Sequence, residues 1–317
     1  MSTLHGYLAF PNFLDDLVSE LKFAGIKPKK MELHGNLVLV DGYKRKPVWA
    51  RNVWGSVERI QFDSVSDAVR KLKALGLRWS LCPHLNHRRA DLIVQGLRVP
   101  KFPPLRFPTD VMPDKDLGSF LLVSETELLA SVHCSQTVPQ GELAFLEDKE
   151  NPPTRAYLKL WEVFTRLGIR PRAGDRCIDL GSCPGGWTGV IAKLGASVVS
   201  VDRSEIAPEV LALPGVEFIQ GNAFTLDPLR FEKLDWIFSD VISEPQKLLE
   251  LVQRWLVVHP QASYVCSVKF KGQTDFRIMN AFMRIRGSSL IHLNHNKHEV
   301  TWVRLGVDRD EASINGT

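Results

Sequence analysis

The chain has 317 residues, of which 44% are hydrophobic and 24% are charged, a composition typical of globular proteins with room for two domains. This composition excludes a disordered or collagen-like chain, and no apolar run approaches the roughly 20 residues that span a bilayer. The first residues hold no basic segment before an apolar stretch, so a secretory signal is not expected. Five scattered cysteines without a CxxC pair argue against a disulfide scaffold and predict a cytoplasmic location.

The net charge of +4 is unevenly distributed along the chain. Residues 1–106 carry 18 Lys and Arg against 9 Asp and Glu, whereas residues 107–150 carry 2 against 9. A basic front segment favours a polyanionic partner, for which RNA or DNA is the first candidate. On charge alone, a solvated basic face without a partner is an equal alternative.

Residues 1–98 are predicted to form a small, basic α+β domain. Its apolar patterns indicate a strand, a helix, a strand and a helix at residues 6–10, 13–21, 37–40 and 66–75. Basic clusters interleave with tryptophans, and this combination suits the phosphates and unstacked bases of RNA, although a tryptophan is more often a core residue. The residues assigned to RNA contacts are Lys44, Arg45, Lys46, Arg88 and Arg89, with Arg155 and Lys271 in the second half.

Residues 99–150 are predicted to be a connector followed by a pair of strands. Five prolines lie between residues 100 and 113, and each removes a donor and fixes φ, so an extended segment is expected there. The strands are predicted at residues 120–123 and 128–133. Asn151-Pro152-Pro153 then separates this connector from the second half of the chain.

Residues 151–317 alternate strand and helix patterns, which predicts an α/β domain with a doubly wound, mostly parallel sheet. The short link between the last two strands predicts an antiparallel pair at one edge of that sheet. In such sheets, ligands bind beyond the carboxyl ends of the strands. The strand candidates are residues 177–180, 197–201, 216–219, 236–239, 263–268, 289–292 and 300–305.

The strongest local motif is Asp179-Leu-Gly-Ser-Cys-Pro-Gly-Gly-Trp187, which joins a predicted strand to a predicted helix. Gly181 lets a ligand approach the backbone, and Gly185 and Gly186 permit unusual dihedral angles at the helix entrance. The first amides of that helix can receive an anionic group such as a carboxylate. Because the spacing is not GxGxxG, a dinucleotide site is not predicted.

Polar residues also follow the next strands. Asp202 lies about twenty residues after the glycine turn, where a carboxylate accepts hydrogen bonds from ribose hydroxyls, with helix capping as the alternative role. Asn222 follows the third strand, where its amide can meet an adenine edge. These strand ends together describe a class I S-adenosylmethionine site. The residues assigned to the cofactor are Asp179, Gly181, Cys183, Pro184, Gly185, Gly186, Trp187, Asp202, Asn222, Ala223 and Asp240.

The ordered motifs resemble those of the FtsJ-type RNA ribose 2′-O-methyltransferases, and most of all the bacterial RlmM-type enzymes, which methylate a cytidine of large-subunit rRNA. The motifs are the glycine turn, Ser-Asp240-Val-Ile-Ser-Glu-Pro, Val-Lys269 and His298-Glu299-Val-Thr. The resemblance covers residues 151–317 and extends loosely to the front, where that family carries a THUMP RNA-binding module. It implies a Rossmann-like class I methyltransferase fold, S-adenosylmethionine as cofactor, and ribosomal RNA or a precursor particle as partner.

The resemblance also implies a catalytic Lys-Asp-Lys-Glu tetrad, which falls on Lys159, Asp240, Lys269 and Glu299. In the predicted helix 154–167, Lys159 lies opposite the apolar stripe, from which it can point into a cleft. A free lysine has a pKa of about 10.4, so a lysine acts as a base only where its surroundings favour the neutral amine. Lys159 is expected to place a second positive charge near Lys269, and the two carboxylates to orient the amines and the hydroxyl.

Three alternatives remain open at this point. One is an RNA-binding assembly factor that keeps the fold without turnover, against which the intact tetrad argues. Another is a methyltransferase for a protein or a small molecule, which the basic front disfavours. Zinc is the third, but no fourth ligand is visible near either histidine-rich set, so no metal is predicted. Those sets are Cys82, His84 and His87, and His292, His295 and His298.

Overall fold

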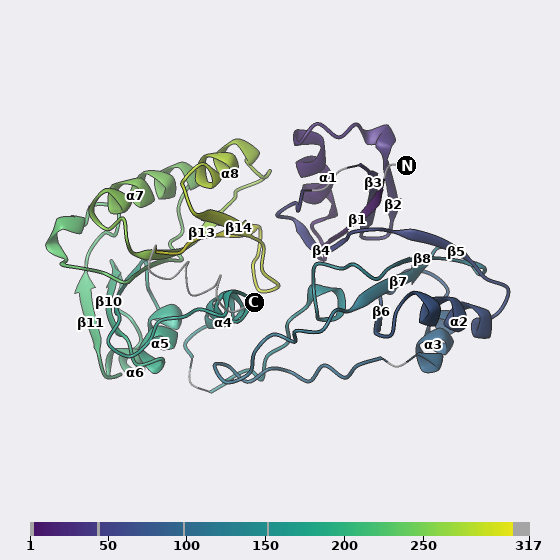
Figure 1. Ribbon diagram of the computed structural model, residues 1–317. Helices are drawn as coiled ribbons and strands as arrows, with labels where there is room; N and C mark the ends of the chain where they lie inside the picture. The colour runs from purple at the N-terminus through teal and green to yellow at the C-terminus, as the bar shows by residue number, and fades with distance from the viewer. Residues whose placement is uncertain (1–2, 43–44, 98, 151, 307–317) are drawn as a thin grey trace. The chain divides into compact units, whose positions relative to one another are not determined.

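The computed structural model describes residues 3–42, 45–97, 99–150 and 152–306. The chain divides into two compact units (Figure 1). The first consists of Met1–Arg106 and Asp110–Ala144, and the second of Phe107–Thr109 and Phe145–Thr317. Among the described residues, no helix combines the length and the apolar character that crossing a bilayer requires.

Within the described residues, the first unit contains two four-stranded sheets. The first sheet has the order β2-β3-β1-β4, and each neighbouring pair is antiparallel. Strand β3 is buried at four of its five positions, so the predicted apolar run lies inside the sheet. The elements of this part are β1 (Leu4–Ala9), α1 (Leu14–Phe23), a 3₁₀ helix (Pro28–Lys30), β2 (Met31–His34), β3 (Leu37–Asp41) and β4 (Ala50–Trp54).

The second sheet has the order β5-β8-β7-β6, in which only the β6–β7 pair is parallel. Its elements are β5 (Glu58–Gln61), α2 (Val65–Leu75), β6 (Trp79–Leu81), α3 (His87–Gly96), β7 (Gly118–Leu122), β8 (Glu127–Ser131) and a 3₁₀ helix (Pro139–Gly141). The strand pair predicted inside the connector 99–150 is β7 and β8, and it forms the centre of this sheet. All five residues of β7 are buried, because the strand lies between two neighbouring strands. The pair therefore belongs to the first unit and not to a separate connector.

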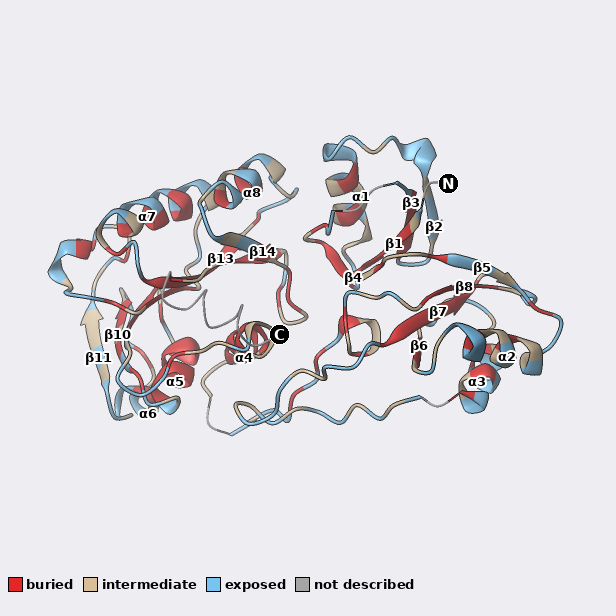
Figure 2. Ribbon diagram, viewed as in Figure 1, coloured by how far each residue is buried: buried red, intermediate tan, exposed pale blue. Residues whose placement is uncertain are grey.

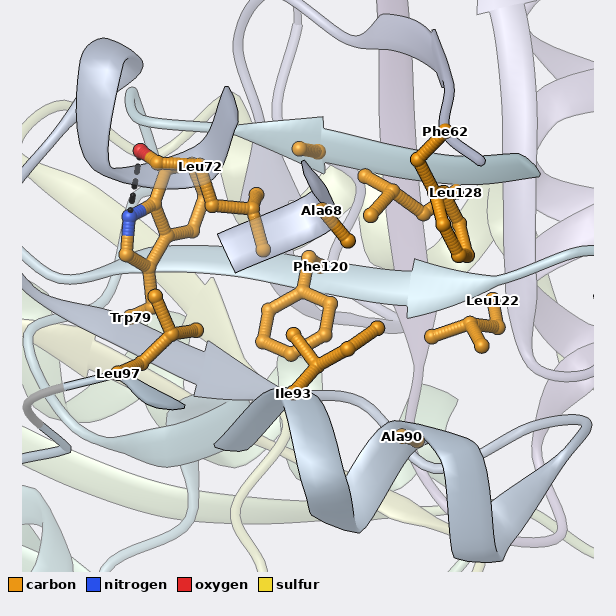
Figure 3. Packing of buried hydrophobic residues seen from close by; sticks show 11 residues of the cluster. Phe62, Ala68, Leu72, Trp79, Ala90, Ile93, Leu97, Phe120, Leu122 and Leu128 are labelled. Carbon is orange, nitrogen blue, oxygen red and sulfur yellow. Dashed lines mark hydrogen bonds between the residues drawn. The ribbon is translucent and has the colours of Figure 1, made fainter. Parts of the chain in front are cut away.

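Helices α2 and α3 pack against one face of the second sheet (Figure 3). Leu72 of α2, Ile93 of α3 and Phe120 of β7 are each fully buried in this cluster. The Trp79 indole nitrogen donates a hydrogen bond of 3.1 Å to the carbonyl of Leu72, so a buried polar group is satisfied. Trp49, Trp54 and Trp79 are at most 1% exposed, which makes them core residues and not stacking platforms for RNA.

The second unit is built on a seven-stranded sheet with the order β11-β10-β9-β12-β13-β15-β14. The described strands of this sheet are parallel except β15, which runs antiparallel to both of its neighbours. This order confirms the predicted Rossmann-like class I methyltransferase sheet, with its antiparallel strand one position inside the edge strand β14. The strands are β9 (Arg176–Leu180), β10 (Ser197–Asp202), β11 (Val216–Gln220), β12 (Trp236–Ser239), β13 (Ser263–Lys269), β14 (Ser288–Ile291) and β15 (Glu299–Arg304).

Helices cover both faces of this sheet, α7 and α8 on one and α4, α5 and α6 on the other (Figure 1). The central strands β9, β12 and β13 are therefore buried almost throughout. The red colour of β13 in Figure 2 shows this for one of them. The helices are α4 (Tyr157–Leu167), α5 (Gly186–Lys193), α6 (Pro208–Leu211), α7 (Pro245–Val258) and α8 (Phe276–Met283), with a 3₁₀ helix at Pro228–Arg230.

Charged residues of α4 opposite its apolar stripe are buried in the structure. Lys159 is 9% exposed and Glu162 is fully buried, so neither lies on a solvent-facing stripe. Both charges have partners of opposite sign: Asp240 and Glu299 for Lys159, and Arg166 for Glu162. Burial of charge is tolerated where such pairs are complete.

Candidate active site

The carboxyl ends of three adjacent parallel strands, β10, β9 and β12, meet at one edge of the second unit's sheet. The glycine turn begins there, and Gly181 has a φ of +82°. A Cβ atom at this position would lie 2.6 Å from the Cβ of Val241, so only glycine fits between the two loops. The resulting narrow pocket, of about 40 Å³, is lined by Thr154, Ala156, Asp179, Gly181, Ser182, Cys183, Pro184, Gly186, Trp187 and Asp240.

Asp179 anchors a chain of buried hydroxyl groups below the pocket. Thr188 donates to its Oδ2 atom at 2.7 Å, Thr188 and Ser200 share a bond of 3.0 Å, and Ser200 donates to Ser182 at 2.7 Å. The other oxygen, Oδ1, is buried and has no hydrogen-bond partner among the described residues. Burial raises the pKa of Asp179 to about 7, although the bond from Thr188 acts in the opposite direction.

The unpartnered Asp179 Oδ1 provides a test of whether these residues fit S-adenosylmethionine. A buried carboxylate oxygen without a donor favours a ligand that brings one, and the amino group of the cofactor is such a donor. The pocket also includes Gly186, the first residue of α5, and the backbone amides at a helix N-terminus suit an anionic group such as the cofactor's carboxylate. The residues present therefore fit the amino-acid portion of the cofactor.

Asp202, Asn222 and Ala223 lie at the carboxyl ends of β10 and β11 and are not part of the narrow pocket's lining. The carboxylate of Asp202 accepts from the backbone N–H of Cys183 at 3.1 Å and of Ser204 at 3.0 Å. It thus fixes the glycine turn and still has lone pairs for ribose hydroxyls. Asn222 is exposed, and its side-chain oxygen accepts from a backbone N–H two residues on, whereas Ala223 is buried.

Trp187 lines the pocket but is mainly a core residue. It is 3% exposed, and its indole nitrogen donates to the carbonyl of Ala156 at 3.0 Å. Gly185 has a φ of +106° at the entrance to α5, so the predicted need for glycine at this position has a backbone cause. The pocket residues that the sequence analysis did not assign are Thr154, Ala156 and Ser182; of these, only Ser182 lies inside a recognisable motif.

The structure brings the four tetrad side chains together. Lys159 Nζ donates to both carboxylate oxygens of Asp240, each at 3.1 Å, and lies 2.7 Å from Glu299 Oε1. Lys269 Nζ lies 3.1 Å from Asp240 Oδ1 and donates to the backbone carbonyl of Asp240 at 2.6 Å. Lys269 and Glu299 are also direct partners in the β13–β15 ladder.

The two lysines differ in the number of acceptor oxygens around the side-chain nitrogen. Among the described residues, Lys159 has three acceptor oxygens, which match the three donors of an ammonium group. Lys269 has two, a carboxylate oxygen and the backbone carbonyl of Asp240. The described residues therefore pair Lys159 more completely than Lys269.

The electrostatics of the cluster favour the charged form of Lys159. Burial lowers the pKa of Lys159, but the charges of Asp240 and Glu299 outweigh it, so the pKa is raised above its ordinary value. Burial raises the pKa of Asp240, but Lys159 and Lys269 outweigh it, so the pKa is lowered. Lys159 and Asp240 are therefore a stable ion pair at neutral pH.

The residues assigned to RNA lie in different surroundings. Lys44 lies outside the described residues, and Arg45, Lys46, Arg88 and Lys271 are exposed. The Arg155 guanidinium donates to Glu147 at 2.7 Å, and the Arg89 guanidinium lies 5.4 Å from the ring centre of Phe62. Arg89 is thus partly a packing residue.

A second basic feature of the first unit joins residues that the sequence analysis left unassigned. Lys27, Lys29 and Lys30 line a surface hollow of about 420 Å³ together with Asp41. This hollow holds three positive charges against one negative charge, so it suits a phosphate group better than a cation.

A larger hollow of about 650 Å³ lies among α4, α5 and α6 and contains none of the four tetrad residues. The narrow pocket, in contrast, lies where the strand ends meet and includes Asp240 of the tetrad. Among the described residues, no group of three or more His, Cys, Asp or Glu side chains is placed to hold a metal ion. His292 and His298 instead bond to the carbonyl of Glu299 and to the hydroxyl of Thr274.

The raised pKa of Asp179 predicts a pH-dependent stability in the absence of cofactor. An aspartate ordinarily ionises near pH 4, and this one near pH 7 in the folded chain. The unfolded chain therefore loses this proton first, and the stability that the protonated group contributes is lost as the pH rises through about 7. Thermal melting should show a larger loss from pH 5 to pH 8 in the parent than in Asp179→Asn. Glu217→Gln, which changes an exposed carboxylate, is the control; equal losses in all three proteins would contradict the assignment.

Comparison with known proteins finds relatives of the second unit. Residues 153–289 match the model of the FtsJ-like methyltransferases. Ribosomal RNA large subunit methyltransferase M of Halorhodospira halophila (strain DSM 244 / SL1) is 38% identical over 109 residues, which are 33% of this chain and 32% of that protein. The same enzyme of Hahella chejuensis (strain KCTC 2396) is 30% identical over 187 residues, 57% of this chain and 47% of that protein.

The chain thus aligns with between about a third and a half of the length of these curated relatives. Among solved structures, the Aeropyrum pernix fibrillarin in complex with S-adenosyl-L-methionine has a TM-score of 0.38 at 15% identity, covering 62% of this chain and 85% of that one. The resemblance predicted from the motifs is confirmed: residues 153–289 match the FtsJ-like methyltransferases, and the chain is similar to the large-subunit ribosomal RNA methyltransferases M.

Proposed function

We propose that this chain transfers a methyl group from S-adenosylmethionine to a ribose 2′-hydroxyl of RNA, with large-subunit ribosomal RNA as the substrate. The observation that carries the proposal is the convergence of Lys159, Asp240, Lys269 and Glu299 beside the cofactor pocket, with one lysine fully paired and the other not. The names of the relatives, which are ribosomal RNA methyltransferases, support the choice of substrate.

When bound, S-adenosylmethionine supplies a methyl group on a positively charged sulfur atom. The accepting ribose oxygen must lie in line with that methyl group and lose its proton during the transfer. We assign the proton to Lys269 Nζ, whose two N–H groups are oriented by the carboxylate and the carbonyl of Asp240. The lone pair of the neutral amine then accepts the hydroxyl proton.

Lys159 has a different role in this proposal. Its ammonium is held by Asp240 and Glu299, and it stays charged. A fixed positive charge disfavours a second one nearby, so it favours the neutral form of the base. It also favours the negative charge that develops on the ribose oxygen as its proton leaves.

The first unit supplies the RNA-binding surface in this proposal. Its exposed basic residues and the hollow lined by Lys27, Lys29 and Lys30 offer positive charge at several points. Phosphate contacts of this kind position an RNA without reading its sequence. We propose free ribosomal RNA or a precursor particle as the binding partner and, accordingly, the cytoplasm as the location.

The proposal is tested by mapping ribose methylation in RNA from cells with and without the gene. We expect one 2′-O-methyl group of large-subunit RNA to disappear in the deleted strain and to return when the parent gene is restored. A gene carrying Lys269→Met is the matched control and should restore nothing. An unchanged ribose-methylation map would contradict the proposed activity and favour an RNA-binding factor without turnover.

Substitutions of Lys269 test its role as the base. Lys269→Met removes the amine and should lower the single-turnover rate by about 10²- to 10⁴-fold, the usual contribution of a general base. Lys269→Arg should be nearly as slow, because a guanidinium stays protonated and cannot accept the hydroxyl proton. Calorimetry should find the affinity for S-adenosylmethionine close to the parent's in both variants. Lys247→Arg, at an exposed position, is the control. Near-parental transfer by Lys269→Arg would leave Lys269 only an orienting charge.

Charge reversal in the first unit tests the RNA-binding surface. The double variant Arg45→Glu, Lys46→Glu should bind RNA more weakly and with a flatter salt dependence. The slope of the logarithm of the binding constant against the logarithm of the salt concentration should become shallower by about 0.7–0.9 for each phosphate that is no longer neutralised. Lys233→Glu, Lys247→Glu changes two exposed side chains of the second unit and matches the change in net charge. Binding titrations at several salt concentrations separate the two. If both double variants weaken binding equally, the front basic residues make no specific contribution.

A further inference from the structure

Glu162 is a fully buried carboxylate on α4 whose partners, Asn294 and Arg166, lie outside the tetrad. Its Oε2 atom accepts from the backbone N–H of Asn294 at 2.9 Å, and its Oε1 atom accepts from the side-chain amide of Asn294 at 3.0 Å. Arg166 also donates to Oε1, through Nε at 2.9 Å, and lies 2.8 Å from it through Nη2. The carboxylate is therefore completely paired, and one residue, Asn294, takes both of its oxygens.

Asn294 lies in the turn between β14 and β15, and Glu299 of the tetrad is the first residue of β15. Glu162 is three residues beyond Lys159 on α4, so the two side chains lie on the same side of that helix. Two links thus join α4 to this turn and the strand that follows it. One is the ion pair of Lys159 with Glu299 at 2.7 Å, and the other is the bidentate contact of Glu162 with Asn294.

Three of the tetrad residues obtain their positions from the sheet. Lys269 and Glu299 are partners in one ladder, and Asp240 follows β12, which pairs with β13 in parallel. Lys159 is different, because it lies on helix α4 and not on a strand or at a strand end. Its long side chain has many rotamers, so its position depends on where α4 is held.

Aromatic packing holds α4 against the sheet but does not by itself fix its rotation. Phe164 packs edge-on against Trp236 and Phe238, with ring centres 5.9 Å and 6.1 Å away. Apolar contacts of this kind have little directional preference, whereas a bidentate hydrogen bond fixes both distance and angle. A buried carboxylate is also costly to desolvate, so an apolar residue at position 162 would serve packing alone equally well.

We propose that Glu162 and Asn294 are positioning residues for the transfer reaction. They fix α4 against the turn before β15, so that Lys159 Nζ lies between Asp240 and Glu299. This inference rests on the proposed function for its effect on methyl transfer, but the placement of Lys159 is a property of the folded chain and is measurable without turnover.

The first test compares rate with cofactor binding. Glu162→Gln replaces one acceptor by a donor that faces the Asn294 amide and Arg166, and Asn294→Ala removes the side-chain bond but keeps the Glu162–Arg166 pair. Both variants should lower the single-turnover rate, by about 10-fold to 100-fold if Lys159 shifts by an ångström or less. Their affinity for S-adenosylmethionine should stay within about twofold of the parent's, because the pocket does not include either residue. Thr165→Ala on the same helix is the control and should keep the parental rate.

A double-mutant cycle separates positioning from a general structural role. If Glu162 acts through Lys159, the Glu162→Gln change should lower the rate in the parent and have little further effect in a Lys159→Met background. If the two losses simply multiply, Glu162 contributes to stability alone and the inference is overturned.

A third experiment measures the exposure of the Lys159 side chain in the absence of RNA. Brief acetylation followed by mass spectrometry compares Lys159, whose side chain is 11% exposed, with Lys193, which is 51% exposed. Glu162→Gln and Asn294→Ala should raise the labelling of Lys159 relative to Lys193, and Thr165→Ala should leave the ratio unchanged. Raised labelling in a protein that methylates no RNA would overturn the proposed function and keep the positioning inference. Unchanged labelling in both folded variants would overturn the inference whatever the activity.

Discussion

The ammonium of Lys159 lies between the carboxylates of Asp240 and Glu299, and the organisation of the second unit depends on this contact. Three buried or half-buried charges are costly unless they stay together, so a helix and the ends of two strands must converge at one point. The direction of β15 makes this possible. Because β15 runs antiparallel to its neighbours, its first residue lies at the edge where the parallel strands end. A parallel strand in that place would begin at the opposite edge of the sheet.

Two carboxylates of the same pocket have opposite electrostatic environments. Asp240 is paired with two lysines, and its pKa is lowered, whereas Asp179 is bonded to a hydroxyl group, and its pKa is raised. Such a separation is typical of sites that assign different tasks to groups of the same chemistry. In the proposed reaction, Asp240 orients the amines, and Asp179 is available to an incoming donor. The glycine turn leaves room for a ligand to approach its backbone.

Much of the second unit could be predicted from the sequence, because alternating strands and helices leave a strong periodic signal. The strand ends then located the polar residues, and the resemblance assigned the tetrad that the structure brings together. The first unit was predicted only in outline. Its strands β2 and β6 have four and three residues, of which only Trp79 and Ser80 are buried, so they leave little apolar pattern. The burial of Glu162 was missed because its partner, Asn294, lies 132 residues away in the chain.

The antiparallel ladder between β13 and β15 has a consequence for how this protein can change over evolutionary time. Successive side chains of a strand alternate between the two faces of a sheet, and Lys269 is paired directly with Glu299. Loss or gain of one residue in the preceding turn, with the ladder slipping by one position to accommodate it, would turn the carboxylate to the other face of the sheet. The length of the segment from Asn294 to Glu299 is thus more strictly constrained than its composition. Insertions are better accommodated in the exposed stretch 271–273, where no ladder has to keep its alignment.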